Sequence, residues 1–550
     1  MKPVRRSLIV VWLTAFSLAL SLCPGILLET KVSAAANGGS NPGSDNSAKL
    51  ANKESKVSSD LRQKLRGARS NVATVRVILQ FNEQVSLQLN GFLGRYGIHV
   101  NRHFHNLNMR VVELPQSVID VLADFPQVSF ISLDQEVRSF GHVTATSGAD
   151  DVRTQTTTSL LGGTTTTTLD GTGIGIAVLD SGIDTSHKSF LGKDDVSRVV
   201  VSKDFTGENR TDDPYGHGTH VAATAAGNGR VANGKYLGIA PNAKIINLRV
   251  LDSQGRGSVS ALLSALDWLL NNRTAYNIRV ANMSLGTLAV SSYQNDPVCQ
   301  AVRKLVNAGM VVTAAAGNNG KNSLGNKVYG HIHSPGIEPS AITVGAANTF
   351  GTDARADDAI TTYSSRGPTR GFTTDANGLK HYDNLIKPDV VAPGNKLVYA
   401  EAINNLLVTQ HPELDAGVSQ NDTRRQMYMS GTSMATPCVA GAAALLLQAN
   451  SKLTPNMVKA ILMYTAQPLS GFNMFEQGAG EINLKGAVQL AKLFKTNLLA
   501  TTLVGTSLLT AAAPSPQTTI ANHTFNWAQG LIFNRTYATG TALITSYQKV

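Results

Sequence analysis

Three residues of different type, an aspartate, a histidine and a serine, lie in sequence surroundings that suit nucleophilic catalysis. Asp180 ends the apolar run in AVLDSGID, His217 lies between two glycines in YGHGTHVA, and Ser433 lies among small residues in MSGTSMATP. A serine hydroxyl becomes a strong nucleophile when a histidine accepts its proton and a carboxylate orients the imidazole. Their order along the chain therefore predicts an Asp, His, Ser triad that attacks an acyl carbon.

A fourth residue, Asn318, adds a hydrogen-bond donor to this set. It follows another apolar run in VVTAAAGNNG, and its side-chain amide could donate to a developing oxyanion. Ser433 opens a predicted helix, so its N–H would be among the unpaired donors at the positive end of the helix dipole. Pro437 agrees with this interpretation because the first turn of a helix tolerates proline.

Each motif alone has a second interpretation. Asp180 could cap a helix, and Asn318 could serve only turn geometry. His217 and His220 could form half of a metal site, but no further Cys, His or acidic ligand stands at zinc-type spacing beside them. We therefore predict no metal ligand, and the order of the four motifs favours catalysis.

The elements that must position these residues alternate between strand and helix. Apolar runs such as GIGIAVLD, at 173–180, are typical of strands buried on both faces. VSALLSALDWLLNN, at 259–272, has the period of an amphipathic helix. The alternation predicts an α/β fold, a parallel sheet with helices on both faces. Functional side chains gather at the carboxyl ends of the strands in such sheets, which would bring the motifs together.

A smaller unit precedes this region. Residues 72–140 have the order β-α-β-β-α-β if the middle segment splits at Asn106, which predicts a small ferredoxin-like α+β domain. Residues 37–71, rich in Asn, Gly, Ser and Lys, are predicted to be a linker. At the other end, residues 496–550 are predicted to link into a small β-rich attachment whose role the sequence does not indicate.

Two polar stretches are predicted to form surface loops. The first is TTTSLLGGTTTTT, at 156–168, which is low in complexity. The second is the segment 351–386, which carries SSRGP and a long polar insertion.

The N-terminal residues 1–36 have the pattern of a signal peptide. Basic residues precede the apolar run LIVVWLTAFSLALSL, and the small-residue stretch VSAAA follows. The run is shorter than the ~20 residues that span a bilayer, which disfavours a retained anchor. We expect a secreted protein, extracellular or periplasmic, with no stable membrane span after signal removal.

Cysteine content and charge exclude two further classes. Without the signal peptide only Cys299 and Cys438 remain, too few for a disulfide framework. The net charge of +11 is scattered along the chain, and no basic patch with interleaved aromatic residues stands out. Nucleic acid is therefore not an expected partner.

The motifs LDSGID, HGTHVA, AAAGN and GTSMATP together resemble those of the subtilisin-like serine proteases, or subtilases, across residues 72–495. The resemblance implies a subtilisin-like catalytic domain at 148–495 and a serine endopeptidase that acts on polypeptides. It also implies roles for the four residues: Ser433 as nucleophile, His217 as general base and then acid, Asp180 as the orienting carboxylate, and Asn318 as oxyanion donor.

The same resemblance implies a precursor. Residues 72–140 are similar to the family's inhibitory propeptide, an intramolecular inhibitor whose removal activates the enzyme. We place the cut loosely between Arg138 and Ser147, because the strand-like pattern ends there.

Substrate-binding residues also follow from the resemblance. MSLG, with Ser284, Leu285 and Gly286, is similar to the extended segment that pairs with the substrate backbone, and Gly255 and Gly257 of DSQGRGS are expected on the other side. A peptide bound as an added strand gains affinity from main-chain hydrogen bonds.

The chain departs from the family at one metal site. Ser189 stands where the family's best-known calcium site has an acidic residue, and the loop GNGRVANGKYLGIAP is not the usual asparagine-rich loop. We therefore expect no required cofactor, although calcium elsewhere stays open. His333, just before SPG, is a candidate for the floor of the main specificity pocket.

Two alternative functions use the same features. A subtilase fold kept as a non-catalytic binding module is disfavoured because no triad position is substituted. An esterase or transacylase with this triad would share the mechanism, and comparison of ester with peptide substrates would separate it from a protease.

Overall fold

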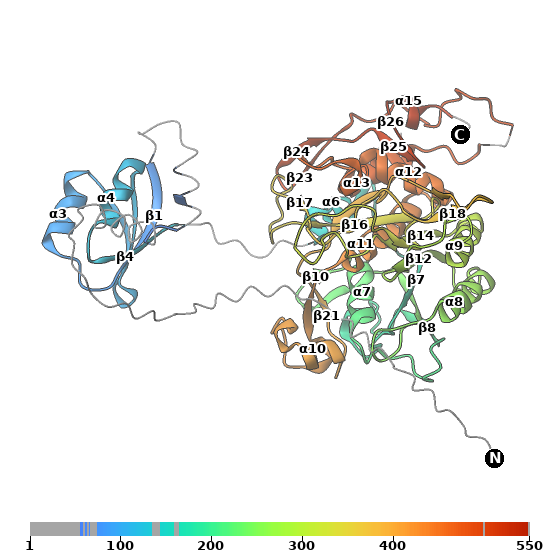
Figure 1. The fold of residues 1–550 in the computed structure, drawn as a ribbon, viewed down its shortest axis with the longest axis horizontal. Coiled ribbons are helices and arrows are strands. Elements are labelled where there is room, and N and C mark those ends of the chain that lie inside the picture. The colour runs from blue at the N-terminus through green and yellow to red at the C-terminus, as the bar shows by residue number, and fades with distance from the viewer. Residues whose placement is uncertain are drawn as a thin grey trace, which may run out of the picture. The chain divides into compact units, whose positions relative to one another are not determined.

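The computed structural model describes residues 56–58, 61–62, 65, 74–134, 143–158, 164–498 and 501–547. The predicted signal peptide and nearly all of the predicted linker lie outside these residues. The chain divides into two compact units, residues 1–137 and 138–550, and each is described by itself (Figure 1).

The N-terminal unit is a four-stranded antiparallel sheet with its own core. Its elements are β1 (Thr74–Phe81), α3 (Leu87–Arg95), β2 (Val100–Phe104), β3 (Met109–Pro115), α4 (Ile119–Ala123) and β4 (Val128–Leu133). The strand order is β2-β3-β1-β4. Val77 and Leu79 of β1 are buried with Leu89 of α3 and Leu122 of α4. One face of the sheet therefore packs against both helices.

The second unit is built on a parallel sheet. Its strands lie side by side in the order β8 (Val199–Asp204), β11 (Lys244–Arg249), β7 (Gly175–Asp180), β12 (Ile278–Met283), β14 (Val311–Ala315), β16 (Ile342–Asn348) and β20 (Val390–Pro393). All these neighbours are parallel, and only the short β17 (Ala359–Ile360) pairs antiparallel with β16. The predicted parallel sheet is therefore present.

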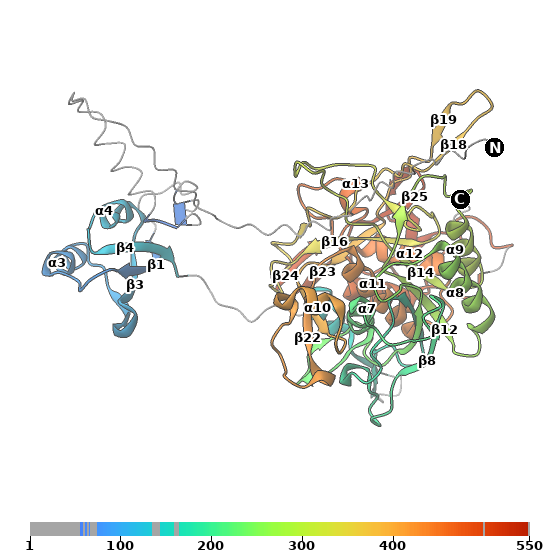
Figure 2. The same ribbon diagram turned by 60° about the horizontal axis from the view of Figure 1, so that its bottom comes forward.

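Helices cover both faces of this sheet, and the central strand β7 shows why. Ile176 and Val178 pack with one set of helices, whereas Ala177 and Leu179 pack on the opposite face. The first set is α7 (His217–Ala226), α11 (Thr432–Ala449), α12 (Pro455–Thr465) and α14 (Leu484–Leu493). The second is α8 (Val259–Asn272) and α9 (Pro297–Asn307), which lie side by side in both views (Figures 1 and 2).

The helix α11 lies inside the molecule. Among the described residues it is the one helix long and apolar enough to cross a membrane, with a mean hydropathy of 1.3, but 83% of it is buried within the fold. Such burial is typical of a core helix. Because α11 packs on β12, β14 and β16 as well as on α7, it connects the sheet to the neighbouring helices.

Both stretches that we predicted to be surface loops contain regular structure. The threonine-rich residues form an antiparallel hairpin of β5 (Thr154–Thr158) and β6 (Thr164–Thr168), which agrees with the preference of β-branched side chains for strands. The segment 351–386 contains β17 and a hairpin of β18 (Phe372–Thr374) and β19 (Lys380–Tyr382). Low complexity and polarity concealed these strands.

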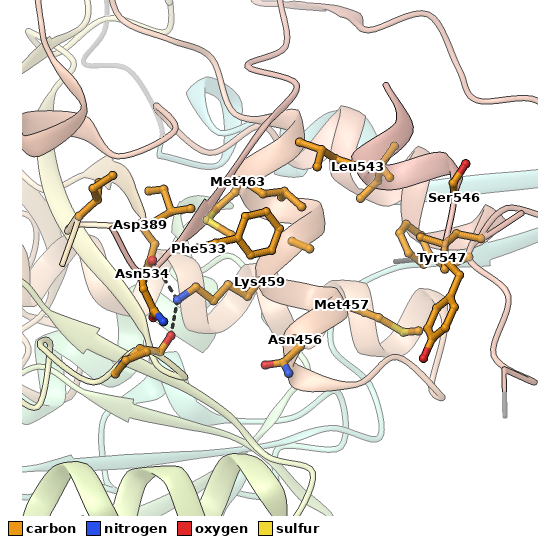
Figure 3. Close-up of a pocket in the computed structure, with 18 of the residues that line it drawn as sticks. Asp389, Asn456, Met457, Lys459, Met463, Phe533, Asn534, Leu543, Ser546 and Tyr547 are labelled. Atoms are coloured by element: carbon orange, nitrogen blue, oxygen red, sulfur yellow. Dashed lines mark hydrogen bonds and ion pairs between the residues drawn. The ribbon is translucent and has the colours of Figure 1, made fainter. Parts of the chain in front are cut away.

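The C-terminal residues belong to the same compact unit as the sheet. They form two hairpins, β23 (Gln517–Ile520) with β24 (His523–Asn526) and β25 (Gly530–Phe533) with β26 (Thr536–Thr539), and end at α15 (Ala542–Thr545). Trp527 is buried against Gly486 of α14. Between α12, β25 and α15 lies a pocket of about 530 Å³, with Lys459 bonded to Asp389 at one end (Figure 3).

Candidate active site

The carboxyl end of the sheet brings an aspartate and a histidine together. Asp180 is the last residue of β7 and is buried, and His217 is the first residue of α7. The His217 Nδ1 lies 2.6 Å from Asp180 Oδ1. When Nδ1 donates its proton to this carboxylate, the other ring nitrogen, Nε2, is left as a proton acceptor.

A second buried carboxylate, Asp213, holds the turn that leads into α7. Its oxygens accept hydrogen bonds from Ser181 Oγ at 2.7 Å, Gly216 N at 2.8 Å and Thr219 N at 2.8 Å. Ser181 directly follows Asp180, so Asp213 ties the strand end to the histidine turn. The sequence analysis missed Asp213, because TDDPYG has the composition of an ordinary polar turn.

The two carboxylates set the basicity of the imidazole. Burial lowers the pKa of His217, but the charge of Asp180, the hydrogen bond to it and the charge of Asp213 outweigh burial. The pKa of His217 therefore lies above its ordinary value. A base with a raised pKa binds a proton more tightly, which suits a group that must accept one during the reaction.

The candidate nucleophile lies at the start of the buried helix. Ser433 is the second residue of α11. Its hydroxyl donates to Ser284 O at 3.0 Å, and the Ser284 hydroxyl donates to Ser433 O at 2.7 Å. Because a hydroxyl has a single hydrogen, Ser433 in this conformation donates to the strand end and not to an imidazole.

Helix packing places the starts of α7 and α11, which carry His217 and Ser433, on the same edge of the sheet. The helices α7 and α11 contact each other, and a Cβ built on Gly441 would lie 2.9 Å from Ala225 O. Gly441 follows Ser433 in α11 by the same number of residues as Ala225 follows His217 in α7. The bond to Asp180 holds the start of α7 at the end of β7, and the bonds to Ser284 hold the start of α11 at the end of the neighbouring parallel strand β12.

Asn318 is oriented by the residue before the serine. Its Oδ1 accepts hydrogen bonds from Thr432 N at 2.9 Å and Thr432 Oγ1 at 3.0 Å. The Nδ2 then faces the other way, toward the space beside Gly431. A Cβ built on Gly431 would lie 3.4 Å from Asn318 Nδ2 and 3.6 Å from Ser433 N. Two amide donors therefore border one small space that glycine leaves open.

The predicted substrate-binding residues lie on two sides of this site. Ser284 contacts Ser433 directly, and the segment with Leu285 and Gly286 continues into β13 (Thr287–Leu288), which pairs with β15 (His333–Ser334). Gly255 packs against the ring of Tyr215, and Gly257 bridges to Leu251. Ser284 therefore lies beside the serine, and Gly255 lies beside the histidine turn through its contact with Tyr215.

The remaining histidines of the sequence analysis have separate partners. His220 Nε2 donates to Leu397 O at 3.1 Å, and burial lowers the pKa of His220 to about 3, so it stays neutral. His333 Nε2 donates to Asn319 Oδ1 at 2.7 Å, beside Gly286. In the part of the chain that the structure describes, no group of three or more Cys, His or acidic residues is arranged to hold a metal ion.

Arg249 is a further residue of the site that the sequence analysis did not identify. It is fully buried at the end of β11, where it lies opposite Asp180 in the strand register. Its Nε donates to Ser181 O at 3.0 Å, and its Nη2 lies 2.5 Å from Glu208 Oε2. Arg249 thus holds the main chain directly after Asp180. An arginine that ends a buried strand, as in IINLRVL, is the signal that could have indicated this supporting contact.

Comparison with known proteins places this geometry in one family. Residues 171–483 match the family model Peptidase_S8, described as the subtilase family. The serine protease AprX of Bacillus subtilis (strain 168) is 35% identical over 333 residues, 58% of this chain and 67% of that protein. An extracellular serine proteinase of Thermus sp. (strain Rt41A) is 33% identical over 65% of this chain and 70% of that protein. Subtilisin E of Bacillus subtilis (strain 168) is 31% identical over 72% of this chain and 84% of that protein.

Proposed function

The chain belongs to the subtilase family of serine proteases, and from this premise we propose that it cleaves peptide bonds by an acyl-enzyme mechanism in which Ser433 is the nucleophile. The observation that carries the proposal is the pair of amides, Asn318 Nδ2 and Ser433 N, that border the space beside Gly431. A carbonyl oxygen in that space would receive two hydrogen bonds as it gains negative charge.

The first half of the reaction follows from the proton acceptor. A bound peptide carbonyl takes the place beside Gly431, and the Ser433 hydroxyl turns from Ser284 O toward His217. Nε2 accepts the hydroxyl proton while Oγ bonds to the carbonyl carbon, and the imidazolium is stabilised by Asp180. The same proton then passes to the leaving amine as the C–N bond breaks, which leaves an ester on Ser433.

The second half repeats the proton transfers with water. His217 accepts a proton from the water that attacks the ester, and returns it to Oγ as the carboxylic acid leaves. The Asp180 carboxylate keeps Nδ1 protonated throughout, because it accepts the hydrogen bond at 2.6 Å. The net reaction converts a peptide bond and one water molecule into a carboxylic acid and an amine.

Substrates bind as extended polypeptide along Ser284 to Gly286. This segment follows β12 and remains next to Ser433 through the paired serine contacts. Main-chain pairing accepts many sequences, and His333 and the turn at Gly255 and Gly257 would then modulate side-chain preference.

The enzyme is made as a secreted precursor with a ferredoxin-like inhibitory propeptide. Three observations support this part: the signal-like pattern of residues 1–36, the separate core of the N-terminal unit, and an extracellular relative. The described residues also limit the cut. Thr144, Thr146 and Ser147 are buried, and Arg355 Nη1 donates to Thr146 O at 2.8 Å. Cleavage is therefore expected upstream of Thr144.

No cofactor is required at the place where the family's best-known calcium site would lie. The buried guanidinium of Arg198 donates there to Ser189 O at 3.0 Å, Ala226 O at 2.6 Å and Ala243 O at 2.8 Å. These carbonyls already accept hydrogen bonds from the positively charged guanidinium of Arg198, which stays in place. The residues therefore do not fit a calcium ion. Burial lowers the pKa of Arg198 to about 10, which still leaves the side chain charged at neutral pH.

Ser433→Ala tests the function. We expect casein hydrolysis and labelling by a fluorophosphonate to disappear, because the nucleophile is gone. Ser430→Ala is the matched control: Ser430 lies in the same loop and accepts a hydrogen bond from Lys396 N, away from the reacting atoms. Equal hydrolysis by wild type and Ser433→Ala would refute the proposal, and ester cleavage without peptide cleavage would indicate an esterase.

N-terminal sequencing of the purified enzyme tests the precursor. A start upstream of Thr144 is expected in the wild type, together with an uncut chain in Ser433→Ala if the enzyme cuts itself. A mature chain that begins after Ser147 would contradict the argument, because residues 144–147 would then have to leave a buried position.

A further inference from the structure

A long excursion interrupts the hairpin that leads to Ser433. The strands β21 (Leu397–Ala400) and β22 (Gln426–Met429) pair antiparallel, with Ala400 opposite Gln426. Between them, residues 401–425 include the helix α10 (Leu406–Gln410). Because β22 ends just before Gly431 and Ser433, the hairpin and the candidate nucleophile are parts of one continuous support.

Asn405, at the start of α10, has a single fixed orientation. It is 1% exposed. Its Nδ2 donates to Ala402 O at 2.7 Å, and its Oδ1 accepts from Val408 N at 2.9 Å as the helix cap. Both ends of the amide are therefore bonded, so the side chain cannot rotate without breaking a buried hydrogen bond.

The same side chain fills the space against the turn that carries His217. A Cβ built on Gly216 would lie 2.6 Å from Asn405 Oδ1 and 2.9 Å from Asn405 Cβ. Gly216 also has φ +102°, a conformation that favours glycine. The next two residues of the excursion add main-chain bonds, from Leu406 N to Pro214 O at 2.8 Å and from Leu407 N to Tyr215 O at 3.2 Å.

These contacts join the excursion to every residue between Asp213 and His217. On the other side of the turn Asp213 binds Gly216 N and Thr219 N. The turn is thus held from two sides, by Asp213 toward the sheet and by Asn405 toward the excursion. A second bond, from His220 Nε2 to Leu397 O at 3.1 Å, attaches α7 to β21.

We infer that Asn405 is a positioning residue for the proposed proteolytic reaction, which acts by holding Gly216 and thereby the His217 imidazole in register with Ser433. The inference rests on the proposed function, since it assigns no chemistry to Asn405 itself. It adds that the β21–β22 hairpin supports base and nucleophile together, so that a disturbance at Asn405 changes their relative placement.

An alternative is that Asn405 only caps α10 and does not position the His217 turn. A serine substitution separates these two roles. Asn and Ser cap helices almost equally well, so Asn405→Ser keeps a cap but loses the outer amide atoms, Oδ1 and Nδ2. With them go the closest approach to Gly216 and the bond to Ala402 O. Asn405→Ala loses the cap as well, whereas Asn405→Asp keeps the shape. Asn421→Ala is the matched control, because Asn421 caps the short helix Asp422–Arg424 of the same excursion at an exposed position.

The kinetic experiment measures kcat and KM on a peptide substrate, beside the melting temperature. For Asn405→Ser we expect kcat to fall about tenfold or more, with KM within about twofold, because small displacements of a catalytic group cost rate more than binding. Asn405→Asp should retain more kcat than Asn405→Ser, and Asn421→Ala should match the wild type. Wild-type kcat in a folded Asn405→Ser enzyme would overturn the inference.

A proton NMR measurement keeps the test decisive if a variant is unstable. The His217 Nδ1 proton, bonded to Asp180, should give a low-field signal that shifts or broadens in Asn405→Asp and Asn405→Ser but not in Asn421→Ala. An unchanged signal in both would refute the positioning role. Failure of the proposed function is recognised separately, because it requires an active Ser433→Ala enzyme.

Discussion

At the scale of single residues, the site depends on how two amides and one imidazole are turned. The Asn318 amide is oriented by Thr432, which is the residue directly before Ser433. The proposed oxyanion donor and the proposed nucleophile are therefore both held by the first turn of α11. A change in either residue should affect transition-state stabilisation more than the binding of substrate.

Asn318→Ala should lower kcat by about 10²–10³ and leave KM nearly unchanged, because the lost hydrogen bond forms only with the oxyanion. Steady-state kinetics on a peptide substrate measures both constants. Asn322→Ala is a matched control, since Asn322 lies in the same loop and its side-chain oxygen accepts from Leu324 N and Asn326 N of that loop. A large rise in KM at constant kcat would instead place Asn318 in ground-state binding.

If His217 is the general base, as we propose, its pKa should set the acid limb of the pH profile. The reaction needs neutral imidazole, and the charge of Asp180 raises the pKa of His217 despite burial. Activity should therefore be lost as pH falls through a value above about 6.5, the ordinary pKa of histidine. In Asp180→Asn the limb should move to lower pH while kcat falls by about 10⁴.

The control for this profile is Asp195→Asn. Asp195 is an exposed carboxylate whose partner is Arg230, so its loss should leave the limb in place. An acid limb that does not move in Asp180→Asn would show that another group titrates.

At the scale of elements, patterns within one segment of sequence predicted the helices and strands that depend on that segment alone. β7, α8 and the helix after Ser433 could be predicted, because apolar runs and the 3.6-residue period act within one segment. Placement of the four motifs at the sheet's carboxyl edge followed from the α/β pattern. The Thr154–Thr158 strand was missed, because a threonine run of low complexity is compatible with an exposed loop as well as with a strand, and pairing with Thr164–Thr168 decides between them.

The supports of the site could not be predicted in this way. Asp213 acts through Ser181 and Thr219, and Asn405 acts through Gly216, a residue far away in the sequence. No sequence period records a contact of that kind. A buried polar side chain is recognised by its partners, and those are known only when the fold is known.

The Arg198 cluster gives a prediction about stability. Arg198→Ala should lower the free energy of unfolding by about 3 kcal/mol or more, because the carbonyls of Ser189, Ala226 and Ala243 lose buried donors. A chelator should not lower the wild-type melting temperature through this site, because a guanidinium and not a metal ion occupies it. Methylguanidinium, which has the same donor group, should partly restore the variant.

Arg230→Ala is the control for this cluster. Arg230 also donates to a main-chain carbonyl, that of Gly192, but at an exposed position, so the cost should be small. A wild-type free energy of unfolding in Arg198→Ala would contradict the assignment of a fixed cation.

At the scale of the whole second unit, Arg355 joins distant parts of the chain. It is buried and donates to Thr146 O, Ile482 O and Gln467 Oε1, and its guanidinium lies 5.2 Å from the centre of the Phe525 ring. Arg355 therefore contacts three separate parts of the unit: its first residues, its last helices and its C-terminal hairpins. Asp358 and Glu481 lie beside it.

Two carboxyl groups beside one arginine make the stability depend on pH. Burial and the nearby Glu481 raise the pKa of Asp358, so the folded chain binds this proton more tightly than the unfolded chain. Its stabilising contribution is complete below about pH 4 and falls as pH rises toward the raised value, by up to about 1.4 kcal/mol per pH unit. Urea unfolding at several pH values measures this slope.

Asp358→Asn removes the linked proton and should flatten the fall of stability between neutral and alkaline pH. Asp195→Asn is again the control, because Asp195 is an exposed carboxylate paired with Arg230 and is not one of the charges that raise the pKa of Asp358. An equally steep slope in Asp358→Asn would show that the proton resides elsewhere.

The burial of α11 has a consequence for how the molecule folds and how long it lasts. The sheet cannot close its core until the chain has been made as far as Ala449, since α11 packs on strands that begin at Gly175. Contacts so distant in sequence make folding slow. Unfolding must likewise withdraw an apolar helix from between its neighbours, so the barrier is high in both directions. If the chain is the protease that we propose, slow unfolding should protect each molecule from digestion by the others.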